Sequence, residues 1–65
     1  MIQIRHKTWR GGSGIQAVPD RAAMRAALER LHRQRLSATA EEDGREIGWV
    51  WQRDDNGRWT WCCET

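Results

Sequence analysis

The stretch that decides the fold is LSATAEEDGREIGWVWQRDDNGRWTWCC, residues 36–63. It contains two dipeptides, Asp43-Gly44 and Asn56-Gly57, each lying between runs of strand-forming residues. Asp-Gly and Asn-Gly are the strongest short-range signals of a tight turn between antiparallel strands. The stretch therefore predicts two successive hairpins, which together form a three-stranded meander. We expect its strands at residues 36–40, 46–52 and 58–63.

The register of the second hairpin depends on how four tryptophans are shared between the two faces of the sheet. All four have odd numbers: Trp49, Trp51, Trp59 and Trp61. A two-residue loop at Asn56-Gly57 divides them between opposite faces, whereas a three-residue loop that begins at Asp55 places them on one face. Each indole brings roughly 150–250 Å² to bury, so we expect the second register. Its facing pairs are Trp51 with Trp61, Trp49 with Cys63, and Arg53 with Trp59.

The first hairpin is expected to support the same face. A two-residue loop at Asp43-Gly44 makes Glu42 face Arg45. It also sets Ala40 opposite Ile47 and Ala38 opposite Trp49, so that small residues face large ones. If Trp51 belongs to this core, its replacement by alanine costs about 3–5 kcal/mol. The predicted core face carries Leu36, Ala38, Ala40, Ile47, Trp49, Trp51, Trp59, Trp61 and Cys63. The predicted outer face carries Thr39, Gly48, Val50, Gln52, Thr60 and Cys62.

One amphipathic helix is predicted over residues 19–34. Pro19 suits a first helical turn, and the carboxylate of Asp20 complements the helix dipole. Glu29 lies four residues from both Arg25 and Arg33, so it is able to pair with either. An apolar stripe with helical spacing is expected to pack on the tryptophan face: Ala23, Met24, Ala27, Leu28 and Leu31.

The N-terminal segment is expected to form a strand from Ile2 to Trp9, followed by a glycine-rich turn at residues 10–14. Residues 15–18 form either a short return strand or a loop. The fold class is therefore α+β in a single small domain, residues 1–65, with one helix on one face of an antiparallel sheet of four or five strands. The order is β-β-α-β-β-β, or β-α-β-β-β if residues 15–18 are a loop.

Length and residue types exclude several classes of protein. The chain has 65 residues, no apolar run of the roughly 18 residues that span a membrane, and no secretory signal at its N-terminus. We therefore expect a cytoplasmic protein without membrane contact. No nucleophile, acid–base pair or cofactor motif stands out, so we expect no enzyme activity, no catalytic residue and no cofactor.

The two cysteines, Cys62 and Cys63, are adjacent in the sequence. Neighbouring side chains of a strand point to opposite faces, so we expect two reduced thiols rather than a disulfide. His6 and His32 lie at no metal-ligand spacing, and no metal site is expected. A metal-binding or redox role of the cysteines is the alternative.

Charge is divided along the chain, although the net charge is only +2. Residues 1–35 carry eight basic and two acidic side chains, and residues 36–65 carry three basic and seven acidic ones. Arginine supplies most of the basic groups, as it does in a GC-rich genome, and it binds phosphates or carboxylates through paired hydrogen bonds. Trp9 lies outside the tryptophan register and either caps the core or anchors a partner. The candidate binding residues are the helix-flank arginines Arg21, Arg25, Arg30 and Arg33, helped by Arg5, Lys7 and Arg10, together with Trp9.

Two segments carry a resemblance to a known family. Gly14-Ile15-Gln16-Ala17 precedes an alanine-rich helix, and the chain closes with the hairpin DNGRWTWCCE, residues 55–64. Over residues 14–63 this order of elements resembles that of a group of small phage-borne anti-CRISPR proteins. Their chains end in a similar Gly-Lys-Arg-Trp-x-x-Cys pattern. The resemblance implies a cofactor-free protein that binds a Cas subunit of a type I complex and blocks DNA recognition, and it transfers no individual site residue.

Small size, divided charge and the lack of a catalytic motif favour a non-enzymatic protein-binding module. The resemblance specifies it as an inhibitor carried by a phage or mobile element, with a Cas subunit as partner. The alternative is a small nucleic-acid-binding protein that uses the arginine-rich flank of the helix. A homodimer formed through an edge strand is a further expectation.

Overall fold

The computed structural model describes residues 1–52 and 57–63, and this part of the chain contains one helix and five strands. The predicted order β-β-α-β-β-β is confirmed, and residues 15–18 belong to a strand. The elements are β1 (Ile2–Lys7), β2 (Ser13–Val18), α1 (Arg21–Arg33), β3 (Ala38–Glu42), β4 (Arg45–Gln52) and β5 (Trp59–Cys63).

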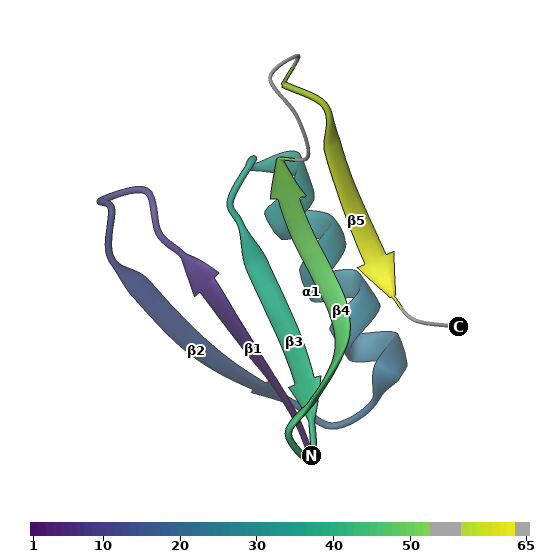
Figure 1. Ribbon diagram of the computed structural model, residues 1–65. Helices are drawn as coiled ribbons and strands as arrows, with labels where there is room; N and C mark the ends of the chain where they lie inside the picture. The colour runs from purple at the N-terminus through teal and green to yellow at the C-terminus, as the bar shows by residue number, and fades with distance from the viewer. Residues whose placement is uncertain (53–56, 64–65) are drawn as a thin grey trace.

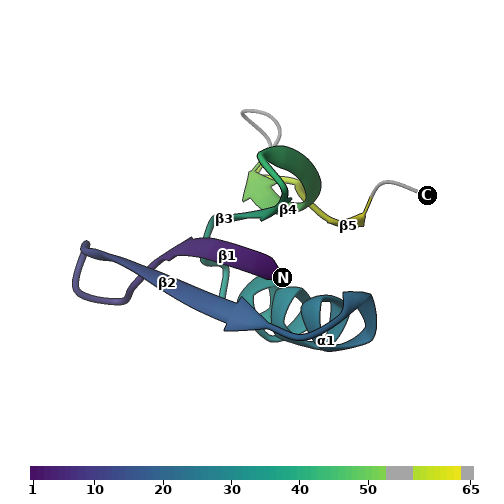
Figure 2. The ribbon, with the colours of Figure 1, turned by 90° about the horizontal axis from the view of Figure 1, so that it is seen from below.

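The strands form a single antiparallel sheet in the order β2-β1-β3-β4-β5. Helix α1 packs on one face of it, chiefly against β4 and β5 (Figure 1). Figure 2 shows the two layers edge-on, with the helix on one side of the strands. No described element covers the other face, which we call the open face.

Strand β1 lies inside the sheet, between β2 and β3. Its sequence alternates, so that one side chain in every two is apolar and faces the core. Ile2 and Ile4 are 1% and 0% exposed and point toward the helix, while Gln3 and Arg5 lie on the open face. The alternation that marks the strand in the sequence therefore also determines which side chains reach the core.

The helix begins two residues later than predicted. Asp20 is its N-cap: the backbone of Asp20 is extended, and its carboxylate accepts a hydrogen bond from the Ala23 N–H at 2.8 Å. A capping side chain needs a non-helical backbone, so Asp20 and Pro19 lie outside the helix. At the other end Arg35 has φ 58°, in the left-handed region, and the Leu36 N–H bonds to the Leu31 carbonyl at 3.0 Å.

The core lies between α1 and the covered face of the sheet and consists of small and medium-sized apolar side chains. Trp59 and Trp61 of β5 pack against its side and are half-buried. The ring of Trp61 stacks on His32 of the helix, with centroids 5.6 Å apart. The buried residues are Ile2, Ile4, Val18, Met24, Ala27, Leu28, Leu31, Ala38, Ala40, Ile47 and Val50.

The first hairpin begins as predicted and then changes register. Asp43 and Gly44 both have positive φ, 54° and 80°, and Glu42 faces Arg45. Between Ala40 and Glu41 the register shifts, so that Ala40 pairs with Gly48 rather than with Ile47. This β-bulge reverses the facing of every later residue of β4. The predicted pairing of Ala38 with Trp49 is therefore wrong: Ala38 pairs with Val50.

Gly48 shows why the bulge is needed. A Cβ built on Gly48 would lie 2.8 Å from Cδ1 of Leu28 and 3.3 Å from the sulfur of Met24. Leu28 and Met24 already occupy this space, so a side chain at Gly48 would have to displace them, and an indole would need the largest displacement. The bulge turns Val50, which is 0% exposed, toward the helix. It turns Trp49 and Trp51 to the open face.

The second hairpin follows neither of the two predicted registers. Val50 pairs with Trp61, Trp49 with Cys62, and Gln52 with Trp59. The pairings of Trp51 with Trp61 and of Trp49 with Cys63 are wrong, and residues 53–56, which include Arg53 and the expected loop at Asp55, lie outside the described residues. The four tryptophans are thus divided, with one pair beside the core and the other on the open face.

Candidate binding surface

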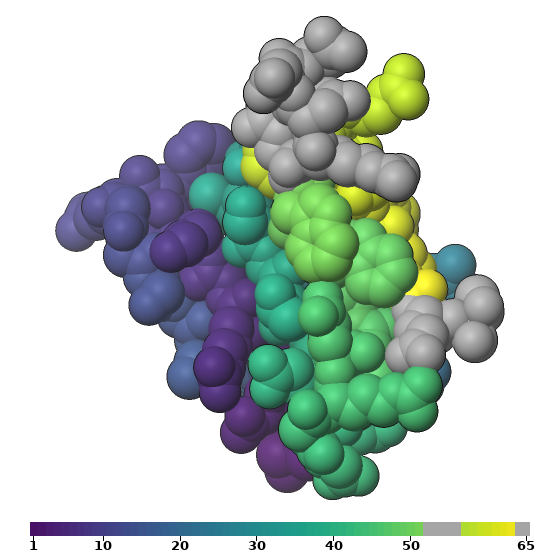
Figure 3. All heavy atoms as spheres, in the orientation of Figure 1, coloured from purple at the N-terminus to yellow at the C-terminus, as the bar shows by residue number. Residues whose placement is uncertain are grey.

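The open face carries an aromatic pair on β4. Trp49 and Trp51, two residues apart on β4, stack on each other with ring centroids 5.4 Å apart and an interplanar angle of 18°. Trp51 is 39% exposed, and Trp49 is half-buried. Figure 3 looks onto this face, where broad light-green side chains of β4 lie in view beside the teal of β3.

The neighbours of this pair follow from the strand register, because residues paired across strands share a face. Arg5, Thr39 and Trp49 form one row across β1, β3 and β4. One row toward the β1–β2 turn lies Lys7, which pairs with Ser13.

The opposite half of the open face is acidic. In the row toward the β3–β4 turn, Gln3 pairs with Glu41, and Glu41 pairs with Glu46. Arg5 and Lys7 are thus separated from Glu41 and Glu46 along the strand direction. The surface has a basic half and an acidic half, and both tryptophans lie in the rows of the basic half.

A hollow of about 250 Å³ lies beside Trp51, and both basic side chains of this face line it. Its other walls come from the ends of β1, β3 and β4, including Ser37 and Thr39. The hollow combines an apolar indole wall with the cationic side chains of Arg5 and Lys7. Such a site accepts an apolar group that carries a carboxylate.

The predicted site residues do not form one surface. Arg5 and Lys7 lie on the open face, on the side of the sheet away from α1. Trp9 and Arg10 lie in the β1–β2 turn, where Trp9 is 75% exposed and caps no core. The helix arginines lie on exposed sides of α1, and Arg5 and Lys7 lie across the sheet from them. The alternation of β1 turns Arg5 and Lys7 away from the helix.

The outer side of α1 is basic but partly neutralised. Arg33 donates to Glu29 at 2.9 Å, which selects one of the two partners predicted for Glu29. Arg21 lies 3.8 Å from Glu42. Within the described part of the chain, Arg25 and Arg30 form no ion pair.

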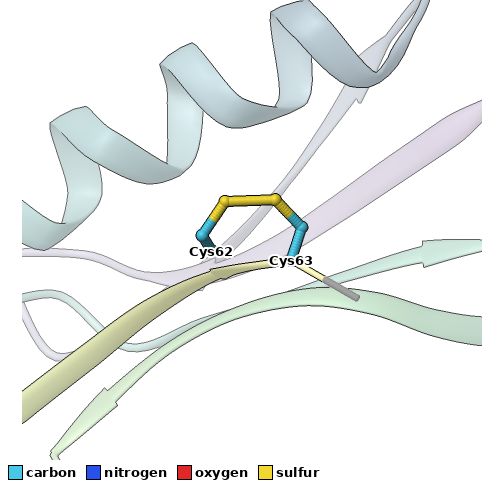
Figure 4. Close-up of a disulfide and its surroundings, with 2 residues drawn as sticks. All are labelled: Cys62 and Cys63. Carbon is cyan, nitrogen blue, oxygen red and sulfur yellow. A yellow bond between two sulfur atoms is a disulfide. The ribbon is translucent and has the colours of Figure 1, made fainter. Parts of the chain in front are cut away.

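The structure also changes the expectation for the cysteines. Cys62 and Cys63 are joined by a disulfide, and Figure 4 shows both side chains on the side of β5 that faces α1. The prediction of two reduced thiols assumed regular strand geometry. Cys62 has φ 101°, outside the strand region, which breaks the alternation and brings the two side chains to one side.

Sequence reasoning missed Trp49 and Trp51 as surface residues because it assigned them to the core. The signal that identifies them is Gly48, since a glycine inside a strand often marks a bulge or a close approach of another element. Ile15, 68% exposed, lies in the same row as Arg5 and extends the apolar part of the open face to β2.

The described residues contain no group of three side chains suited to hold a metal ion and no helix long and apolar enough to cross a membrane. Searches against protein-family models, curated proteins and solved structures gave no match to the chain. The case for function therefore comes from the surface itself.

Proposed function

We propose that the protein is a non-enzymatic protein-binding module and that the open face is its interface. The observation that carries the proposal is the stacked Trp49–Trp51 pair, placed on the uncovered face of the sheet. Tryptophan and arginine dominate the energetically important positions of protein interfaces. Soluble monomers seldom leave a contiguous apolar patch open without use.

The surroundings of the pair define the partner's chemistry. An apolar side chain of the partner packs on Trp51, and a neighbouring carboxylate binds Arg5 or Lys7. Arginine contributes more through such a contact than lysine because its planar guanidinium makes two parallel hydrogen bonds. The partner therefore presents an apolar patch with acidic residues beside it.

The resemblance to anti-CRISPR proteins supplies the narrower form of the proposal. In this form the chain is a cytoplasmic inhibitor from a phage or mobile element, and its partner is a Cas subunit of a type I complex. This form needs no cofactor and no catalytic residue, since occupancy of the subunit's surface is enough to block DNA recognition.

Binding of the full chain to a purified type I CRISPR complex tests this form, with Trp51→Ser as the interface variant and Trp9→Ser as the matched control. Both changes remove an exposed indole, but Trp9 lies in the β1–β2 turn, outside the proposed interface. We expect Trp51→Ser to weaken binding about tenfold or more and Trp9→Ser to change it little. Absence of binding at micromolar concentration contradicts the narrower form, and equal effects of the two changes contradict the assignment of the interface.

A second candidate function is nucleic-acid binding through the outer side of α1. Arg25 and Arg30 favour it, because their guanidinium groups are exposed and form no ion pair with the described residues. It predicts a gel-shift complex at low salt that weakens steeply as salt increases. The double change Arg25→Gln/Arg30→Gln removes the complex, whereas Trp51→Ser leaves it intact. A chain that shifts neither duplex nor single-stranded nucleic acid at low salt contradicts this function.

A further inference from the structure

We propose that, in the free protein, a second copy of the chain occupies the open face and forms a face-to-face dimer. This inference rests on the proposed function in one respect, namely that the open face is a protein interface. It names the occupant of that face when no other partner is bound. The charge pattern and the exposed aromatic pair of the face support it.

The charge pattern of the open face is complementary to itself. Arg5 and Lys7 lie at one end along the strands, and Glu41 and Glu46 lie at the other. Glu41 and Glu46 also face each other across β3 and β4, a pairing of like charges that is unfavourable within one copy. A cation from a second molecule relieves that repulsion, so the acidic end favours a basic occupant.

A two-fold axis that runs across the strands, in the plane of the interface, brings these ends together. Rotation about it reverses the strand direction of the second copy, so the basic half of each face covers the acidic half of the other. An interface of this kind is isologous, and one patch supplies both sides of it. This axis keeps each strand over its own counterpart, so each Arg5 lies over Gln3 of the other copy, one strand away from Glu41.

The aromatic pair lies within the surface that such a dimer buries. Trp49 belongs to the row next to the acidic row, near the proposed axis, and Trp51 lies one row farther from that axis. Trp49 of one copy therefore lies close to Trp49 of the other, and each Trp51 lies over the β3–β4 end of the opposite face. Both indoles lose contact with solvent, as apolar groups commonly do at protein interfaces.

A specific dimer needs nearly the whole open face. The two longer dimensions of the molecule, 33 and 27 Å, limit one face to roughly 900 Å² in projection, and a standard interface buries about 800 Å² per partner. A dimer built on a sheet edge leaves the tryptophans exposed. The face-to-face arrangement buries them.

Sedimentation velocity of the full chain, from low to high micromolar concentration, tests the proposal. We expect a reversible dimer that Trp51→Ser weakens about tenfold or more. Trp9→Ser, the matched control, leaves the dimer unchanged. High salt also weakens it, because exposed charges are screened. Circular dichroism of each variant confirms that the fold persists.

Charge reversal provides a second test that does not depend on tryptophan. Arg5→Glu and Glu41→Arg each place like charges together across the proposed axis, so each weakens the dimer. The double variant Arg5→Glu/Glu41→Arg restores opposite charges and recovers it. A double variant that dimerises no better than the single ones overturns the face-to-face arrangement.

Two results overturn the inference while leaving the proposed function standing. One is a strict monomer that still binds a partner through Trp51. The other is a dimer that Trp51→Ser does not affect, which is expected of an edge-strand dimer. Conversely, a Trp51-dependent dimer that binds no other protein supports the inference and contradicts the narrower proposed function.

Discussion

Gly48 has the largest structural effect of any single residue in the sheet. Its missing side chain allows Leu28 to approach the backbone of β4, and the adjacent bulge turns Val50 inward and both tryptophans of β4 outward. A residue without a side chain thus decides which face of the protein is aromatic.

The first prediction concerns this residue. We expect Gly48→Ala to lower the free energy of unfolding by about 1–3 kcal/mol, because the new methyl group overpacks the core against Leu28 and Met24. Urea denaturation followed by circular dichroism measures the change. Ala17→Ser on exposed β2 is the control and is expected to stay within about 0.5 kcal/mol of the unmodified chain. A Gly48→Ala protein as stable as the control contradicts the close approach of the helix.

The second prediction compares two large side chains. Trp51→Ala is expected to cost less than about 1 kcal/mol, because Trp51 is 39% exposed, whereas Leu28→Ala is expected to cost about 2–5 kcal/mol. This reverses the expectation from the sequence, in which Trp51 was part of the core. Urea denaturation of both variants at one protein concentration decides the order. A Trp51→Ala loss as large as that of Leu28→Ala restores the sequence-based register.

At the scale of elements, a capping hydrogen bond stabilises the N-terminal end of the helix. Asp20 accepts the Ala23 N–H, and the first turn contains no other acidic side chain. We expect Asp20→Ala to cost about 1 kcal/mol and Asp20→Asn to cost little, since asparagine caps as well as aspartate. Thermal denaturation of the two variants gives the comparison. Equal losses from both would show that charge, rather than the capping hydrogen bond, stabilises this end.

Strand β5 carries the disulfide, and its contribution to stability is expected to be small. A bond between adjacent residues closes almost no loop, so it removes little entropy from the unfolded chain. We expect the double change Cys62→Ser/Cys63→Ser to lower the free energy of unfolding by less than about 1 kcal/mol. Thiol titration of the unmodified protein verifies the starting state. A loss of several kcal/mol would mean that the bond holds β5 on the sheet.

The elements themselves were predictable because their signals are local. The Asp43-Gly44 turn, the Asp20 end of the helix and the alternation of β1 each act within a few residues, and all three appear in the structure. The facing of β4 was not predicted because it depends on contact with a helix more than fifteen residues away in the chain. Burial of all four tryptophans needs space between β4 and the helix, and Leu28 and Met24 occupy that space at Gly48.

At the scale of the whole molecule, the two candidate surfaces lie on opposite sides. The open face carries Trp49, Trp51, Arg5 and Lys7, and α1 carries Arg21, Arg25, Arg30 and Arg33. The sequence predicts Arg5 and Lys7 as binding residues from their charge and groups them with the helix arginines. Their alternation with Ile2 and Ile4 in β1 places them on the open face instead. A face-to-face dimer leaves both helices outward, so a dimer presents two basic helix surfaces while the tryptophans are covered.

Hydroxyl-radical footprinting, read residue by residue by mass spectrometry, tests the central claim most directly. At a concentration below self-association, the open-face assignment predicts that Trp51 is oxidised clearly more than the half-buried Trp61, and that it becomes protected when the chain is concentrated or a partner is added. Trp9, in the β1–β2 turn, is expected to stay reactive throughout and serves as the internal reference. If Trp51 resists oxidation in the dilute protein as strongly as Trp61, then Trp51 belongs to the core, which contradicts its assignment to the open face.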